Sequence, residues 1–377
     1  MTGPVSRRGT AGGALSLPYD VSLLFPVLFL VGIGVVMVYS ASSAIALKRY
    51  GTDFYFLKKQ AVFSVMGLMT LVVFRRVPFQ LFRLAAYPLL ALSMVCLAAV
   101  LIPGLGVKAG GAVRWLQVGG IRFQPAEVAR FALIVYLAYS LSKKQDQIRE
   151  FTVGFLPHLL VMGVMALMIL QQPDFGAVVL MGALAWIMLF VGGVRMTHLL
   201  SPLLLLLPLV FGFMIHAEYR VKRLVSFLDP WRYQSDEGYQ VIHSLMAFGS
   251  GGIWGAGIGK GYQKLFYLPE PHTDFIFSVI GEELGMLGVL FILFLYALVL
   301  WRGIVIARNA TDPFGQLIAI GITSAIALQV GVNMGVALGL LPTKGLTLPF
   351  LSYGGTSLLI NMASVGILMN IGSERGK

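Results

Sequence analysis

The stretch Tyr267-Leu-Pro-Glu-Pro-His-Thr-Asp-Phe-Ile-Phe-Ser-Val-Ile-Gly-Glu-Glu-Leu-Gly285 precedes an apolar run that reaches Leu300. It places several ionisable side chains at the mouth and in the first turns of a helix long enough to cross a bilayer. An ionisable side chain at mid-bilayer costs about 2.5–3.5 kcal/mol on insertion scales, so acids beside a span usually face a polar cavity, a partner or a ligand. The stretch therefore indicates a functional site at the mouth of a membrane span.

The composition places the whole chain in the membrane class. Of its 377 residues, 58% are hydrophobic and only 12% are charged, which would leave a soluble globule with an unmanageably apolar surface. The single cysteine, Cys96, cannot form an intramolecular disulfide, and the five scattered histidines give no metal-ligand spacing. We therefore expect an integral membrane protein with no structural metal and no nucleic-acid partner.

Apolar windows of about 20 residues, which cross ~30 Å of hydrocarbon as helices, occur ten times. They lie at 20–41, 55–74, 79–102, 125–142, 153–171, 175–192, 197–216, 274–301, 314–340 and 353–371. The sequence thus predicts an all-α polytopic membrane protein, with ten transmembrane helices in a single domain at 19–377. Residues 1–18 are expected to form a flexible cytoplasmic tail.

The cations of the short connections predict the orientation. An even number of spans places both termini on one side, and the positive-inside rule makes that side cytoplasmic because its short connections and tail carry Arg7, Arg8, Arg75, Arg76, Lys143, Lys144, Arg149, Arg195, Arg302 and Arg308. By bare count the opposite side carries about as many cations, mostly in longer connections. This outer charge calls for an anionic partner, which is either lipid headgroups or a substrate.

Two predicted outer connections are longer than a link between helices needs. One runs from Pro103 to Gln124 and is rich in glycine; the other, 217–273, lies between spans seven and eight. The second contains many aromatic residues and a run with helical spacing from Gly238 to Phe248, so we expect short interfacial helices in it. The glycine-rich run that follows lacks the Ser or Thr of a nucleotide-binding loop.

Seven blocks lie in a fixed order along most of the chain: Arg114-Trp-Leu-Gln-Val-Gly-Gly120, Gln124-Pro-Ala-Glu-Val-Ala-Arg130, Gln172-Pro-Asp-Phe-Gly176, Gly238-Tyr-Gln240, Leu268-Pro-Glu-Pro-His-Thr-Asp-Phe-Ile-Phe277, Gly281-Glu-Glu-Leu-Gly285 and Leu341-Pro-Thr-Lys-Gly-Leu-Thr-Leu-Pro-Phe-Leu-Ser-Tyr-Gly-Gly355. Together they resemble the SEDS family of bacterial cell-wall glycosyltransferases. The last block is more similar to the division members of that family than to its elongation members.

The resemblance implies a ten-span enzyme that polymerises lipid II, a disaccharide-pentapeptide on undecaprenyl pyrophosphate, at the outer face of the bacterial cytoplasmic membrane during cell division. It also implies a class B penicillin-binding transpeptidase and division regulators as partners. The chemistry needs one carboxylate as base for the acceptor hydroxyl and cations around the departing diphosphate, which is already stable as an anion. Whether a divalent cation assists the leaving group is left open, and no other cofactor is expected.

Asp274 matches the family's catalytic aspartate in the His-Thr-Asp-Phe motif and is our candidate for the base. The alternative is structural, because Asp and Thr at a helix start commonly cap free backbone N–H groups. His272, in the same motif, is expected to contact substrate.

Cations of the outer connections are candidates for the diphosphate. Arg114 lies in the glycine-rich connection, where a guanidinium can hold phosphate oxygens in a bidentate manner. Its alternative role is an interfacial anchor beside Trp115. Lys344 is a second candidate, and Lys58 and Lys59 at the start of the second span are weaker ones.

Other acids are expected to have structural roles. Glu127 and Arg130 lie three residues apart on one helix face and are expected to pair with each other along the cavity, with contact to the substrate as the alternative role. Glu282 and Glu283 point about 100° apart and are expected to bond to neighbouring helices. Asp174 is expected to be a turn or cap residue.

Two other classes of function fit the sequence. A lipid II flippase would also have ten spans with acids and glycine-interrupted helices, although it would need access from both faces, whereas the polar groups gather on one side here. A non-enzymatic division scaffold would not depend on Asp274.

Overall fold

The computed structural model describes residues 20–109, 112–118, 121–215, 218–234, 238–265 and 268–373. A helix lies in each of the ten apolar windows, within a few residues at most ends. Their bounds are α1 (Val21–Tyr50), α2 (Tyr55–Arg76), α3 (Leu81–Val100), α4 (Pro125–Lys143), α5 (Leu156–Leu170) after a π-helical turn (Phe151–Phe155), α6 (Phe175–Val191), α7 (Met196–Ile215), α10 (Ile276–Asn309), α11 (Pro313–Ala337) and α12 (Gly355–Ser373).

Seven helical segments in the described part of the chain are long and apolar enough to cross a membrane, and α6 is a shorter apolar helix. The protein is therefore a predominantly helical, multi-pass membrane protein. The count of ten spans stays a prediction.

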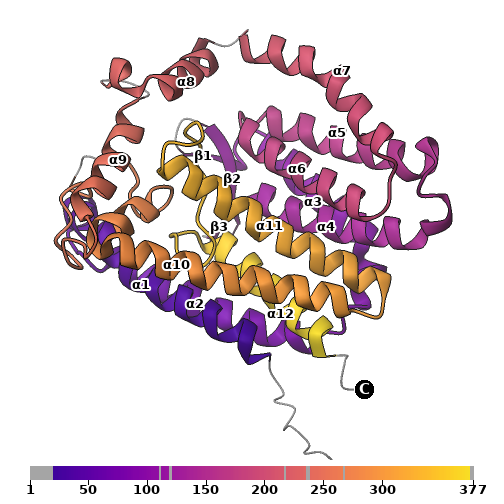
Figure 1. Ribbon diagram of the computed structural model, residues 1–377, viewed down its shortest axis with the longest axis horizontal. Helices are drawn as coiled ribbons and strands as arrows, with labels where there is room; N and C mark the ends of the chain where they lie inside the picture. Colours follow the sequence, from indigo (N-terminus) through magenta and orange to yellow (C-terminus); the bar gives the residue numbers. More distant parts are fainter. Residues whose placement is uncertain are drawn as a thin grey trace, which may run out of the picture.

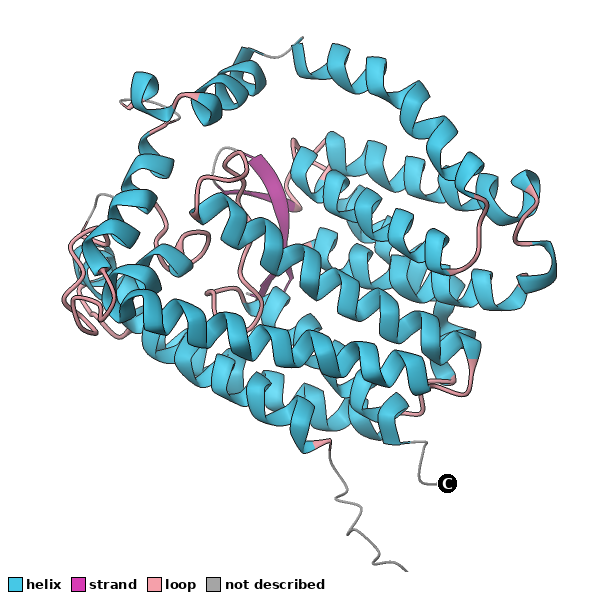
Figure 2. Ribbon diagram, in the orientation of Figure 1, coloured by secondary structure: helices cyan, strands magenta, loops and turns pink. Residues whose placement is uncertain are grey.

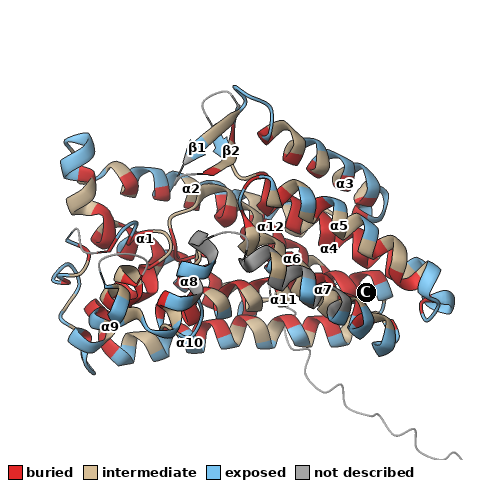
Figure 3. Cartoon of the chain, turned by 90° about the horizontal axis from the view of Figure 1, so that it is seen from above, coloured by how far each residue is buried: buried red, intermediate tan, exposed pale blue. Residues whose placement is uncertain are grey.

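The helices form two groups that share a central contact (Figures 1 and 2). Helices α1, α2, α10 and α12 pack side by side in one group, and α3 to α6 form the other. Helix α11 packs on α10 and α12 in the first group and on α4 and α6 in the second. The buried residues concentrate on α4, α11 and α12 (Figure 3), so these helices form the core against which the connections rest.

Helix α7 departs from the bundle. Among the described residues its main contacts are with α6, the π-helical turn before α5, and α8 (Glu218–Leu228). Figure 1 shows α7 and α8 passing above the rest of the fold towards α9 (Tyr239–Gly251), with a 3-10 turn at Pro230–Tyr233 between α8 and α9. Short helices thus occur in the connection 217–273, as the sequence indicated.

The glycine-rich connection between α3 and α4 is not a loop. It forms a three-stranded antiparallel sheet in the order β1 (Gly106–Ala109), β2 (Ala112–Val118) and β3 (Ile121–Phe123). The all-α prediction was wrong here, because short strands rich in Val, Trp and Phe were hidden between glycine pairs. Strand β2 packs against α3 and α4 and carries Arg114.

Helix α10 is broken at Gly285, which adopts φ 65° and ψ −166° inside an otherwise helical run. The segment after α9 fills the break: Met286 N donates to Gly252 O over 2.9 Å, and Ala256 N donates to Glu282 O over 2.9 Å. A Cβ atom on Gly285 would lie 2.3 Å from Gly255 N. The prediction of one continuous span at 274–301 missed this break, since an isolated glycine is tolerated in many helices.

We predict that Gly285→Ala destabilises the fold, because alanine is strained at this positive φ, at about 1–3 kcal/mol, and its methyl group would meet Gly255. Gly331→Ala on α11 is the matched control: nothing lies within 4 Å of its added Cβ, and alanine favours helix. Thermal unfolding in detergent should show a lower midpoint for Gly285→Ala alone. Equal midpoints for the two variants would contradict the packed break.

Candidate functional site

Connections from distant parts of the chain meet at one end of the bundle. Arg114 of β2 contacts the α5–α6 turn at Gln172. Lys344 of the α11–α12 connection lies against Gly176 at the start of α6, and the adjacent Gly345 lies against Asp274, just before α10. The structure thereby brings four of the candidate residues into one region: Asp274, Lys344, Arg114 and Asp174.

Hydrogen bonds to three consecutive main-chain carbonyls hold the segment that carries Asp274. The Tyr353 N–H donates to His272 O over 2.9 Å, and Ser352 Oγ donates to Thr273 O. Asn333 Nδ2 of α11 donates to Asp274 O over 3.0 Å. The carboxylate of Asp274 points at Gly345, whose hypothetical Cβ would lie 3.1 Å from Asp274 Oδ2. A side chain at 345 would therefore crowd the carboxylate.

Burial raises the pKa of the Asp274 carboxyl to about 7, and the negative charge of Glu270 adds to the rise. A hydrogen bond from Thr273 and the positive charge of Arg114 oppose that rise. A carboxyl with a pKa near neutrality accepts a proton more readily than an ordinary aspartate, which suits a general base.

Lys344 passes directly over the backbone of α6. A Cβ atom on Gly176 would lie 1.5 Å from Lys344 Cε, so only glycine leaves room for the lysine here. Burial lowers the pKa of Lys344 to about 8; Asp174 acts against this shift, and Arg130 and Arg114 act with it. Lys344 therefore has both acids and cations as close neighbours.

Arg114 is fixed by the turn between α5 and α6. Its Nε donates to Gln172 O over 3.3 Å, its second guanidinium nitrogen donates to Pro173 O, and Nε lies 3.8 Å from Asp174 Oδ2. Asp174 is also the N-cap of α6, since its Oδ1 accepts from Ala177 N over 3.1 Å. The turn thus orients one cation and one acid next to Lys344.

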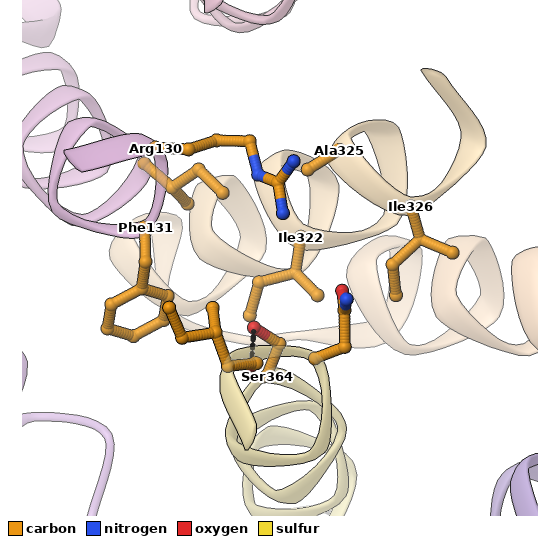
Figure 4. Close-up of a pocket in the computed structure, with 9 residues that line it drawn as sticks. Arg130, Phe131, Ile322, Ala325, Ile326 and Ser364 are labelled. Carbon is orange, nitrogen blue, oxygen red and sulfur yellow. Dashed lines mark hydrogen bonds between the residues drawn. The ribbon is translucent and has the colours of Figure 1, made fainter. Parts of the chain in front are cut away.

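Glu127 and Arg130 form the expected ion pair near the start of α4, and both side chains are buried. The guanidinium of Arg130 also points into a small pocket between α4, α11 and α12 (Figure 4). Asn361 and Ser364 of α12 line the same pocket. At about 10 Å³ it has room for one water molecule at most and is no substrate cavity.

The contacts of His272 and of Lys59 on α2 are mainly with aromatic side chains. The imidazole of His272 is buried against Phe56 and Tyr353, with ring centroids 4.4 and 5.6 Å away. This packing helps to fix the segment that carries Asp274. Burial lowers the pKa of His272 to about 4, so the ring is neutral at pH 7. Lys59 bonds to the hydroxyl of Tyr55 over 2.6 Å, and Lys58 is exposed on the same helix.

Glu282 and Glu283 were expected to bond mainly to neighbouring helices, but they bind mainly to the segment after α9. Glu282 Oε1 accepts from Tyr262 N over 2.7 Å. Glu283 pairs with Lys264, and Ser40 Oγ of α1 donates to it over 2.7 Å. Both acids thus clamp the α9–α10 connection beside the break in α10.

Three residues of the site were not singled out from the sequence. Gly176 and Gly345 stood inside the quoted blocks, but their role depends on close approach between segments far apart in the chain. Asn333 left a visible signal: with Gln329 it forms a pair of amides one turn apart in an apolar span. Among the described residues no group of three or more His, Cys, Asp or Glu side chains is placed to hold a metal ion.

Comparison with known proteins gives one consistent result. A family model described as "Cell cycle protein", FtsW/RodA/SpoVE, matches residues 21–377. A probable peptidoglycan glycosyltransferase FtsW from Geobacter sulfurreducens is 46% identical over 356 residues, which are 94% of this chain and 95% of that protein.

Solved structures agree in fold. A chain of a peptidoglycan synthase complex that coordinates polymerization and crosslinking matches with a TM-score of 0.79 and 31% identity, over 95% of this chain and 99% of that one. The rod shape determining protein RodA from Thermus thermophilus matches with a TM-score of 0.71 and 29% identity, over 97% and 99% of the two chains. The chain therefore belongs to the FtsW/RodA/SpoVE family.

Proposed function

We propose that this protein is a peptidoglycan glycosyltransferase that polymerises lipid II at the outer face of the bacterial cytoplasmic membrane during cell division. The proposal rests on the Asp274 carboxyl, whose pKa is raised to about 7 and which lies against Gly345, the residue that follows the half-buried cation Lys344. The relatives named as peptidoglycan glycosyltransferases support it.

In the proposed mechanism, Asp274 accepts the proton of the acceptor sugar hydroxyl as that oxygen attacks the anomeric carbon of the donor. The bond between that carbon and the diphosphate breaks in the same displacement, which inverts an α-linked donor to a β-linked product. Arg114 and Lys344 stabilise the charge on the leaving diphosphate.

The same proposal includes the arrangement in the membrane. All ten helices α1 to α7 and α10 to α12 span the bilayer, both termini are cytoplasmic, and the site opens on the outer side. The similar chain in a peptidoglycan synthase complex supports a class B penicillin-binding transpeptidase as partner. Division regulators are proposed to join the same assembly.

Asp274→Asn tests the base directly. The amide keeps the shape of the side chain but cannot accept the proton, so we expect normal membrane insertion and a loss of glycan synthesis of about 100-fold or more. Polymerisation of lipid II by purified protein, with and without the transpeptidase, measures this. Polymer made at the wild-type rate would remove Asp274 from the mechanism, and wild-type protein that only moves lipid II across vesicles would favour the flippase.

The pH dependence of the activity follows from the two groups whose pKa values are shifted, Asp274 and Lys344. Asp274 must be deprotonated, so activity should rise as the pH increases through about 7; Lys344 must be protonated, so activity should fall above about 8. The kcat/KM profile on lipid II should be bell-shaped with its maximum between these values. Activity that is constant between pH 5 and 7 would be incompatible with this assignment.

Gly176→Ala should displace Lys344, because its methyl group would occupy the position of the lysine side chain. We expect the KM for lipid II to rise while the protein stays folded, since only the far end of a flexible side chain must move. Gly182→Ala, on the same helix, has only a distant methionine methyl 4.0 Å from its Cβ and serves as the control. An unchanged KM for Gly176→Ala would argue against Lys344 as a ligand of the diphosphate.

A further inference from the structure

Two buried side-chain amides of α11 contact the segments that form the site. Gln329 and Asn333 lie four residues apart and therefore share one face of the helix, and each is only 1% exposed. A primary amide inside an apolar span needs hydrogen-bond partners, because an unpaired polar group is costly there. The amide nitrogens of both side chains donate to main-chain carbonyls, whereas Gln329 Oε1 and Asn333 Oδ1 are buried without a hydrogen-bond partner among the described residues.

Asn333 joins two segments. Its Nδ2 donates to Asp274 O over 3.0 Å and also to Leu346 O, two residues after Lys344. The amide nitrogen carries two N–H donors, so one group can serve both carbonyls. The two carbonyl oxygens fix which amide atom faces them. If the nitrogen and oxygen of the amide were exchanged, the side-chain oxygen would face two other oxygens with no hydrogen between them.

Gln329 holds the same connection without reaching the base. Its Nε2 donates to Thr347 O over 2.9 Å and lies 3.4 Å from Thr347 Oγ1 and from Ser357 Oγ. These partners all belong to the α11–α12 connection and to α12. The two amides thus match in burial and in helix, and of the two only Asn333 also binds the residue that carries the carboxylate.

We propose that Asn333 is a positioning residue, which fixes the Asp274 backbone relative to the Lys344 connection and so sets the spacing between base and cation. This inference rests on the proposed function. Tyr353 N and Ser352 Oγ bind the carbonyls of the two preceding residues, whereas the bond from Asn333 reaches Asp274 itself, which stands before the first turn of α10. A misplacement of about 1 Å at a reacting group can cost 100-fold in rate.

The test compares Asn333→Leu, which keeps the size but removes both donors, with Gln329→Met in the purified full-length protein. For Asn333→Leu we expect kcat for lipid II polymerisation to fall about tenfold to 100-fold with little change in KM. The acid limb of its pH profile should move to lower pH, because a carboxyl released towards water regains hydration. Gln329→Met should keep the wild-type acid limb.

Several outcomes would overturn the inference: a wild-type kcat and acid limb in Asn333→Leu, or the same changes in both variants. Should Asn333→Leu fail to fold, Asn333→Ser replaces it, since serine retains a donor but is too short to reach both carbonyls. Asp274→Asn separates this failure from that of the proposed function. If Asp274→Asn is inactive and Asn333→Leu is unaffected, only the positioning role of Asn333 is refuted. If Asp274→Asn is active, the role of Asp274 as base is refuted.

Discussion

Hydrogen bonds between residues 272–274 and the α11–α12 connection hold the site together. Tyr353 N and Ser352 Oγ bind the carbonyls of His272 and Thr273, while Asn333 links Asp274 to the same connection. These bonds join the entry to α10 to the entry to α12. Since Lys344 belongs to that connection and lies over Gly176 of α6, while Gly345 lies against Asp274, the connection links α6 to the residue that carries the carboxylate.

The charged groups near the site fall into two kinds. Glu127 with Arg130 and Glu283 with Lys264 are buried ion pairs, in which each charge offsets the desolvation of the other. Asp274 and Lys344 are different, because burial moves the pKa of each towards neutrality. Groups of the second kind are the ones suited to proton transfer and to an anionic ligand, and both occur where connections from distant parts of the chain converge.

The sequence predicted the positions of the helices well, because apolar windows of membrane length leave little choice of structure. It also predicted the pair formed by Glu127 and Arg130, which depends only on helical spacing. It could not predict contacts between distant segments, such as Lys344 over Gly176 or Gly345 against Asp274. The break at Gly285 and the sheet at 106–123 were missed since their glycines also occur in ordinary helices and loops.

We propose that the convergence of Asp274, Lys344 and Arg114 opens on the outer side of the membrane. Because Cys96 is the sole cysteine, a Cys96→Ala background allows one reporter, Pro342→Cys, to be placed on the exposed part of the Lys344 connection. A membrane-impermeant maleimide added to intact spheroplasts should label this cysteine, whereas Thr311→Cys, in the α10–α11 connection, should react only after lysis. Labelling of Pro342→Cys only after lysis would place the site on the cytoplasmic side and contradict the account.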